Sequence, residues 1–216
     1  MHVDLPGPAG RIEGLLESPE SPRFAALVLH PHPLFGGTMH NHATYQVAKA
    51  AREAGGASLR IQFRGVGLSE GVHSGGPGEL ADARAALLWL SGRLPSLPLL
   101  VGGMSFGSWI ALQLGCSDPG VQGVLAVGLA SRTLALGFLP GCPRRVAAVQ
   151  AADDEFGSVE EVTRLMAGPA DRRRLAVVAG TTHLFLEDLA ALRREAVAAW
   201  DWLAQEPAIA PRSGSP

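Results

Sequence analysis

Short apolar runs alternate with helix-length segments along most of this chain, and this alternation restricts the fold more than any other feature. The apolar runs are 24–29, 57–63, 97–102, 121–129, 145–150 and 175–179, and the helical segments are 43–54, 79–93, 106–114, 158–166 and 188–203. Runs of this length are too short for helices and are typical of strands buried on both faces. Strands that alternate with helices predict a single-domain α/β sandwich, with a mostly parallel central sheet and helices on both faces.

The chain has 216 residues and shows neither an internal repeat nor a linker between two cores. Residues 1–22, which precede the alternating region, are predicted to form a polar hairpin around the Pro6–Gly10 turn. We therefore expect one domain over residues 1–206 and a flexible C-terminal tail over residues 207–216.

Charge and composition exclude several classes of protein. Lys and Arg number 18 against 20 for Asp and Glu, so the formal net charge is −2 and the sequence has no basic footprint for nucleic acid. No run of about 18 apolar residues predicts a membrane span, and the N-terminus lacks the pattern of a signal peptide. Cys116 and Cys142 are expected to be buried free thiols, and the protein is expected to be cytoplasmic. A homodimer through an exposed sheet edge is left open.

A G-x-S-x-G pattern, Gly103-Met104-Ser105-Phe106-Gly107, stands directly between a predicted strand and a predicted helix. A sharp strand-to-helix turn lifts a serine hydroxyl above the sheet edge, and it requires small residues two positions before and after the serine. Both of these positions are glycine. The turn also puts the Phe106 amide at the positive end of a helix, where it can stabilise an oxyanion. Ser105 is therefore the candidate nucleophile.

A serine nucleophile of this kind needs an acid and a histidine that follow it in the chain, each beyond the end of a strand. The acidic residues 153–155 follow the fifth apolar run, and His183 follows the sixth. The acid would accept a hydrogen bond from one ring nitrogen of His183, while the other ring nitrogen takes the Ser105 proton. Chemistry alone leaves the choice among the three acidic residues open.

The loop 30–42, His-Pro-His-Pro-Leu-Phe-Gly-Gly-Thr-Met-His-Asn-His, has two interpretations. It follows the first core strand, and the amides of His32, Leu34 or Phe35 could donate to an oxyanion, whereas the two prolines have no N–H. Alternatively, the His-x-His spacing at both ends of the loop resembles a zinc site, which would make the protein a metal-dependent hydrolase. The loop carries no carboxylate, so we expect no metal and interpret most of these histidines as hydrogen-bonding groups that fix the loop.

These motifs together resemble the α/β-hydrolase superfamily, and within it the small capless members related to dienelactone hydrolase and to bacterial carboxylesterases. The resemblance rests on the loop 30–37, on Arg64-Gly-Val-Gly-Leu-Ser69, on the Ser105 pattern, and on the Asp154 and His183 loops, in this order over residues 24 to about 205. It implies a catalytic triad that needs no cofactor. Dienelactone hydrolase itself uses a cysteine nucleophile, so its substrate is not implied for a chain with Ser105.

The resemblance also assigns roles that the residues alone leave open. In the family the acid commonly stands three residues after the small residue that closes its strand, which favours Asp154 over Asp153. The oxyanion donors carry over to the amide of Phe106 and to that of Leu34 or His32. Larger relatives insert a cap after the fourth core strand, but here the insertion is too short for a folded lid, which implies an open site. The expected lining residues are Leu34, Phe35, Met104, Phe106, Phe156, Leu184 and Phe185.

The sequence therefore predicts a serine carboxylesterase for small to medium acyl esters, with Ser105, His183 and Asp154 as the triad and an acyl-enzyme intermediate. The expected partner is a small-molecule ester, with no cofactor, nucleic acid or membrane. A thioesterase or a peptidase could use the same triad. A metal-dependent hydrolase based on the loop 30–42 and a non-catalytic binding protein stay as alternatives of other classes.

Overall fold

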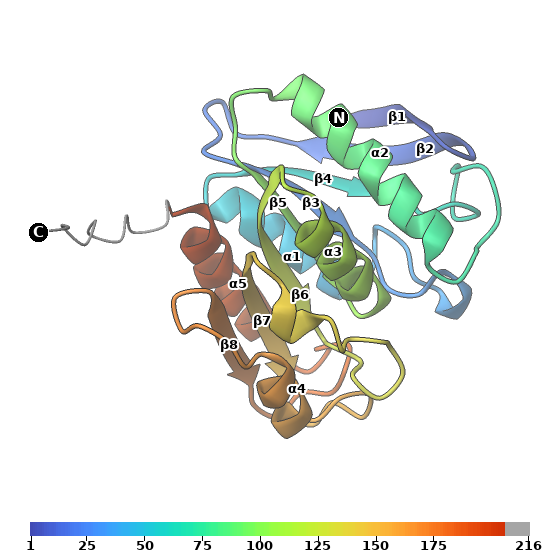
Figure 1. The fold of residues 1–216 in the computed structure, drawn as a ribbon. Helices are drawn as coiled ribbons and strands as arrows, with labels where there is room; N and C mark the ends of the chain where they lie inside the picture. The colour runs from blue at the N-terminus through green and yellow to red at the C-terminus, as the bar shows by residue number, and fades with distance from the viewer. Residues whose placement is uncertain (206–216) are drawn as a thin grey trace, which may run out of the picture.

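The structure, a computed structural model, describes residues 1–205, so the predicted tail at 207–216 lies outside the described residues. This part of the chain folds around one eight-stranded sheet in the order β1-β2-β4-β3-β5-β6-β7-β8 (Figure 1). The strands are β1 (His2–Gly7), β2 (Gly10–Glu17), β3 (Ala25–Leu29), β4 (Ala57–Ile61), β5 (Leu99–Met104), β6 (Val121–Val127), β7 (Arg145–Ala151) and β8 (Arg173–Val178). The helices are α1 (His42–Glu53), α2 (Pro77–Arg93), α3 (Phe106–Ser117), α4 (Val159–Leu165) and α5 (Leu189–Ala204), with short 3-10 turns η1 (Pro33–Phe35) and η2 (Leu139–Gly141).

Six neighbouring strands of the sheet, from β4 to β8, are parallel. The predicted N-terminal hairpin is formed by β1 and β2, and β2 joins the sheet antiparallel to β4. Every residue of β3 and of β4 is buried, as expected of strands that are covered on both faces. The prediction of a mostly parallel α/β sandwich is confirmed.

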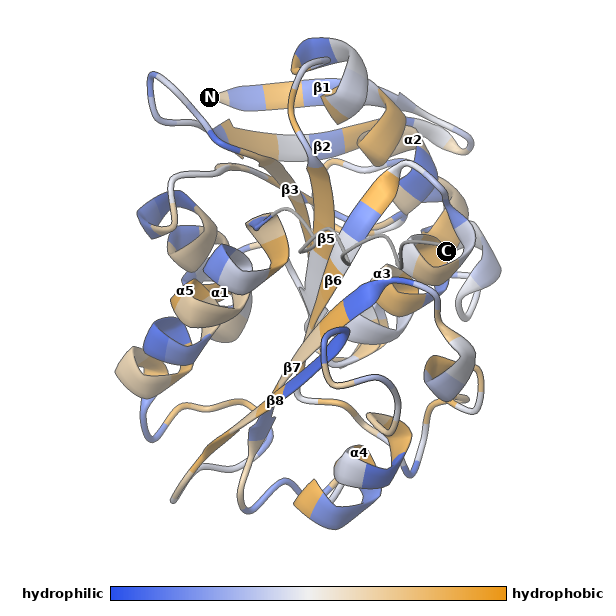
Figure 2. Ribbon diagram, turned by 60° about the vertical axis from the view of Figure 1, so that its left-hand side comes forward, coloured by the Kyte–Doolittle hydropathy of each residue, from blue (hydrophilic) through white to orange (hydrophobic). Residues whose placement is uncertain are grey.

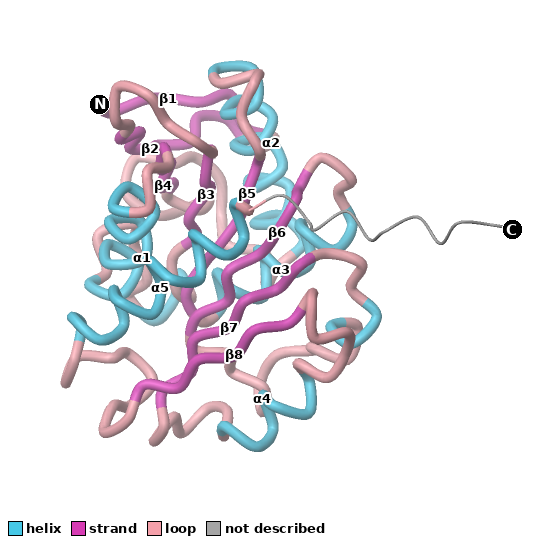
Figure 3. The backbone as a smooth tube through the Cα atoms, turned by 90° about the vertical axis from the view of Figure 1, so that its left-hand side faces the viewer, coloured by secondary structure: helices cyan, strands magenta, loops and turns pink. Residues whose placement is uncertain are grey.

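Helices cover both faces of this sheet. α1 and α5 lie side by side on one face, and α2 and α3 lie on the other (Figure 1 and Figure 3). Two hydrophobic clusters correspond to the two faces: Phe24 and Trp200 belong to the α1 and α5 side, and Phe63, Leu90 and Ile110 belong to the α2 and α3 side. Apolar strands run between the two helix layers in Figure 2. No helix within residues 1–205 is both long and apolar enough to cross a bilayer.

The expected absence of a folded lid is confirmed. The connection from β6 to β7 contains, among the described residues, only the three-residue turn η2 as regular structure. This connection packs onto the α3 side, where Leu136 and Leu139 are buried and the Trp109 indole donates to the Ala135 carbonyl at 3.1 Å. The carboxyl edge of the parallel strands therefore has no domain built over it.

The expectation of two free thiols is wrong. Cys116, near the end of α3, and Cys142, directly after η2, form a disulfide with their Cα atoms 5.0 Å apart. The reason is tertiary: the β6–β7 connection folds back against the end of α3 and brings together two residues that are 26 positions apart. A spacing of two cysteines in the sequence carries no information about such a return of the chain.

Candidate active site

Ser105 occupies the sharp turn between β5 and α3. Its φ of 55° and ψ of −116° lie in a region that residues with a side chain rarely adopt, and its N–H donates to the Val127 carbonyl at 2.8 Å. Added Cβ atoms show why both flanking glycines are needed: at Gly103 a Cβ would collide with the Gly107 backbone, and at Gly107 with the Leu29 carbonyl. The backbone thus presents the Ser105 side chain at the carboxyl edge of the sheet.

His183 and Asp154 reach the same edge from later loops. Asp154 follows β7 and His183 follows β8, so both arise at the carboxyl ends of parallel strands. His183 Nε2 lies 2.8 Å from Ser105 Oγ, and His183 Nδ1 lies 2.9 Å from Asp154 Oδ2 and 3.0 Å from Asp154 Oδ1. The Asp154 side chain is fully buried and the His183 side chain nearly so. The three predicted side chains therefore form one continuous hydrogen-bonded line.

The structure distinguishes between the neighbouring acidic residues. Asp154 turns inward, and besides His183 it accepts hydrogen bonds from the Phe156 N–H at 2.9 Å and from Gln150 Nε2 at 2.8 Å. Asp153 is exposed, and its N–H donates to the Thr181 carbonyl. Glu155 is also exposed and accepts from the His183 N–H rather than from the ring. Only Asp154 of the three acidic residues faces the imidazole of His183.

Gln150, in β7, is a part of this arrangement that the sequence analysis missed. Its side chain is fully buried behind Asp154, and it also binds the backbone of Leu129 and of Gly157. The signal in the sequence is a glutamine that follows four apolar residues, 146–149, in the same strand, because a buried amide requires hydrogen-bond partners. That signal does not say which partners the amide has.

Backbone donors near Ser105 were predicted at Phe106 and at either Leu34 or His32. Phe106 is the first residue of α3, and the N–H groups in the first turn of a helix have no partner within that helix. The Leu34 N–H donates to His32 Nδ1 at 3.2 Å, and the Phe35 N–H donates to the His32 carbonyl at 3.1 Å. The N–H groups of His32 and Phe106 have no acceptor within residues 1–205. The geometry therefore favours His32 over Leu34 as the second donor.

The histidines of loop 30–42 do not gather into a metal centre. Both His30 ring nitrogens are occupied: Nδ1 lies 2.7 Å from the Pro31 carbonyl, and Nε2 accepts from the Phe63 N–H at 3.0 Å. Burial lowers the pKa of His30 to about 4, so the ring is neutral. His40 and His42 are exposed, and no three His, Cys, Asp or Glu side chains in the described part of the chain are placed to share a metal ion.

The ring of His32 fixes its own loop. Its Nδ1 caps the 3-10 turn η1, and the ring packs against Phe106, Phe35 and His73 with centroids 4.9, 4.8 and 4.7 Å away. Burial is the largest cause that lowers the pKa of His32, and the nearby His73 lowers it further, which favours the neutral form of the His32 ring. A neutral ring whose Nδ1 accepts a hydrogen bond carries its proton on Nε2.

Exposed apolar side chains, here called the apolar rim, lie in the loops that follow β3, β7 and β8. Phe35 and Leu34 are 86% and 70% exposed, Phe156 packs edge-on against the His183 ring, and Leu184 is partly exposed. The expectation that Met104 lines the site is wrong, because Met104 is fully buried in the hydrophobic cluster on the α1 and α5 side. Phe106 and Phe185, which were also expected to line the site, are buried as well, so neither contributes exposed surface to it.

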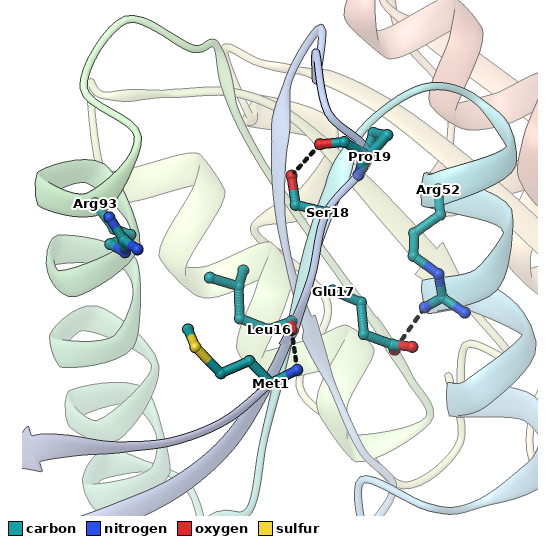
Figure 4. Close-up of a pocket in the computed structure, with 7 residues that line it drawn as sticks. All are labelled: Met1, Leu16, Glu17, Ser18, Pro19, Arg52 and Arg93. Carbon is teal, nitrogen blue, oxygen red and sulfur yellow. Dashed lines mark hydrogen bonds and ion pairs between the residues drawn. The ribbon is translucent and has the colours of Figure 1, made fainter.

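A hollow of about 660 Å³ lies at the opposite edge of the sheet (Figure 4). It is lined by Met1, Leu16, Glu17, Ser18, Pro19, Arg52 and Arg93. Glu17 pairs with Ser58 near the start of β4, whereas Ser105 follows the end of β5. Within the hollow, Arg52 donates to Glu17 at 2.6 Å and the Met1 amino group donates to the Leu16 carbonyl at 2.8 Å. Because these residues lie at the amino ends of the parallel strands, the hollow is separate from the triad.

Several known proteins are similar to this chain over most of its length, although no family model matches it. An uncharacterized protein of Rickettsia prowazekii (strain Madrid E) is 41% identical over 165 residues, which cover 74% of this chain and 69% of that protein. A solved structure from Agrobacterium tumefaciens, described as a putative α/β hydrolase of unknown function, is 31% identical, with a TM-score of 0.84 and coverage of 93% of this chain and 95% of that one. The chain belongs to the α/β-hydrolase superfamily.

Two further α/β hydrolases have nearly the same fold. A serine hydrolase homologue from Coxiella burnetii is 28% identical, with a TM-score of 0.86 over 92% of this chain and 96% of that one. A serine hydrolase from Xanthomonas campestris, described as having no lid, is 27% identical, with a TM-score of 0.84 over 93% of this chain and 94% of that one. Both agree with an α/β hydrolase fold, and the second agrees also with the absence of a lid.

Proposed function

We propose that this capless α/β hydrolase is a serine carboxylesterase that acts on small to medium acyl esters. One observation carries the proposal: a hydroxyl, an imidazole and a buried carboxylate are joined by hydrogen bonds of 2.8 and 2.9 Å at the open edge of the sheet. In this arrangement the imidazole can take the serine proton, and the carboxylate orients the ring and stabilises the imidazolium that forms. Similarity to serine hydrolases supports a hydrolytic function.

The reaction follows from this order of groups. Ser105 Oγ attacks the ester carbonyl carbon while His183 Nε2 removes the hydroxyl proton, and the Nδ1–H donates to Asp154. The tetrahedral oxyanion accepts hydrogen bonds from the Phe106 and His32 amides. When the intermediate collapses, His183 gives its proton to the departing alcohol. Water, activated by the same imidazole, then releases the acid and restores Ser105.

The rim supports the choice of an ester with a modest acyl group. Phe35, Leu34, Phe156 and Leu184 offer exposed apolar surface beside the triad. An open rim buries only part of an acyl chain and excludes little. Each added methylene should therefore increase the affinity by less than about 0.8 kcal/mol, the value for full burial. We infer broad acceptance of short acyl groups rather than selection of one.

Reaction with a fluorophosphonate probe tests the proposal. The probe should label the parent protein, and Ser105→Ala should abolish both labelling and hydrolysis of short p-nitrophenyl esters. Ser117→Ala is the matched control, because Ser117 lies in the same helix and only bonds the backbone of that helix and the side chain of Arg84. Hydrolysis that persists in purified Ser105→Ala would exclude this mechanism. A panel of esters, thioesters and amides then identifies the preferred leaving group.

A metal-dependent hydrolase has less support, because His30 already uses both ring nitrogens within its loop. Its test is independent of the one above. Esterase activity should survive prolonged treatment with a strong chelator, whereas activity lost to the chelator and restored by added zinc would favour the metal site.

A further inference from the structure

Gln150 is a fully buried residue whose amide NH2 group and amide oxygen both have hydrogen-bond partners. Its Oε1 accepts from the Leu129 N–H at 2.8 Å, and its Nε2 donates to the Gly157 carbonyl at 2.7 Å and to Asp154 Oδ2 at 2.8 Å. The partners fix the orientation of the amide, because a backbone N–H can only donate and a carbonyl and a carboxylate can only accept. The NH2 group must therefore point at Asp154.

This amide restricts how the Asp154 carboxylate can turn. Oδ2 receives Gln150 Nε2 on one side and faces His183 Nδ1 on the other, while Oδ1 receives the Phe156 N–H. The donor is neutral, so it holds the carboxylate without cancelling its charge. A lysine or arginine in its place would compensate that charge and weaken the stabilisation of the imidazolium.

The same side chain ties the acid loop to the sheet. Leu129 lies just beyond the end of β6, and Gly157 lies in the loop that carries Asp154. Because Gln150 bonds to both backbones, the position of the acid is set by the two neighbouring strands β6 and β7 rather than by its loop alone. Loops without such ties are more mobile than the strands that they follow.

We propose that Gln150 is a positioning residue for the esterase reaction: it holds Asp154 in the orientation in which the carboxylate supports His183. This inference rests on the proposed function, since it gives Gln150 a role only through the triad. It predicts a loss in kcat rather than in KM, because Gln150 touches neither the rim nor the nucleophile.

Gln150→Leu removes the amide while keeping a similar volume. We expect kcat to fall on the order of tenfold, the effect of one hydrogen bond to a charged group, with KM unchanged. In an Asp154→Ala background the same substitution should have no further effect on kcat, because the group through which it acts is gone. Gln62→Leu is the matched control: Gln62 is also buried and accepts from the Met39 N–H, but it follows β4, two strands away from β5.

Gln150→Glu gives a second test if the leucine variant does not fold. A protonated carboxyl can still accept from Leu129 and donate to Asp154, whereas an ionised one cannot donate and repels Asp154. Burial and the neighbouring carboxylate both delay ionisation of the new side chain to higher pH than usual. We therefore expect the ratio of variant to parent kcat to fall as the pH rises, while Gln62→Glu gives a ratio that does not change with pH.

The outcomes separate this inference from the proposed function. A parental kcat in folded Gln150→Leu, or a Gln150→Glu ratio that stays flat or rises with pH, would overturn the positioning role. A loss of kcat that is equally large with and without Asp154 would do the same. If Asp154→Ala itself keeps the parental kcat, the triad is wrong, and the failure lies with the proposed function.

Discussion

At the scale of single residues, His30 shows how the fold fixes the protonation state of a group outside the triad. The ring is fully buried next to Phe63, with centroids 4.7 Å apart. Through the Phe63 N–H it joins the end of β3 to the segment that follows β4. Burial is the largest cause of its low pKa, about 4. Between about pH 6.5 and pH 4, His30 is protonated in the unfolded chain but neutral in the native state. The free energy of unfolding therefore depends on pH through His30.

Replacing His30 by glutamine tests this link. The unfolded histidine takes a proton near pH 6.5, whereas the native one does so only near its pKa of about 4, so the parent loses stability as the pH falls through that window. Glutamine offers an acceptor to the Phe63 N–H but does not titrate. Denaturant unfolding should show the parent's advantage over His30→Gln shrinking by about 3 kcal/mol between about pH 7 and pH 4. A difference that stays constant, or the same shrinkage in the exposed-site control His42→Gln, would contradict the explanation.

Residue types were predictable where local rules fix them. The glycines around Ser105 and the strand ends before Asp154 and His183 follow from turn geometry and from the meeting of parallel strands at one edge. The assignment of Met104 to the site lining was wrong because the strand before Ser105 includes Met104. Met104 is the last residue of β5, and its side chain lies on the buried face of the sheet. Gln150 was missed because no pattern in the sequence says which group a buried amide faces.

At the scale of elements, each predicted helix and strand is present, but the ends moved. The strand predicted over 57–63 ends at Ile61, because the Phe63 N–H bonds to the His30 ring instead of a neighbouring strand. The strand predicted over 97–102 begins two residues later, since Leu97 closes a turn on the Leu94 carbonyl. Apolar runs locate an element, but its ends depend on hydrogen bonds to distant residues.

The disulfide between Cys116 in α3 and Cys142 after η2 links two elements, and its contribution to the free energy of unfolding can be measured. It closes a loop of 26 residues, for which chain entropy predicts a contribution of about 3.5 kcal/mol. The double variant Cys116→Ser, Cys142→Ser should therefore unfold about 7 to 14 °C lower, as measured by calorimetry. Reductant should lower the Tm of the parent by a similar amount and leave that of the double variant unchanged. Equal melting of parent and double variant would show that the bond contributes nothing to stability.

At the scale of the whole molecule, the open carboxyl edge determines how activity should depend on the physical state of the substrate. The β6–β7 connection forms no cap and is fastened to α3 by the disulfide. No segment of the described chain has to move aside before an ester reaches Ser105. The rate with an ester of limited solubility should therefore rise smoothly and saturate in the dissolved range. A sharp increase as the ester forms droplets would indicate a covering segment and contradict the prediction.

The strands that carry the three reacting side chains have a consequence for synthesis of the protein. Ser105 follows β5, whereas Asp154 and His183 follow β7 and β8, so the base arrives with the last strand of the sheet. A ribosome-bound chain that stops short of β8 carries a hydroxyl no more reactive than that of free serine. The growing polypeptide should therefore not react with esters until His183, in the loop after β8, has been synthesised and β8 has joined the sheet.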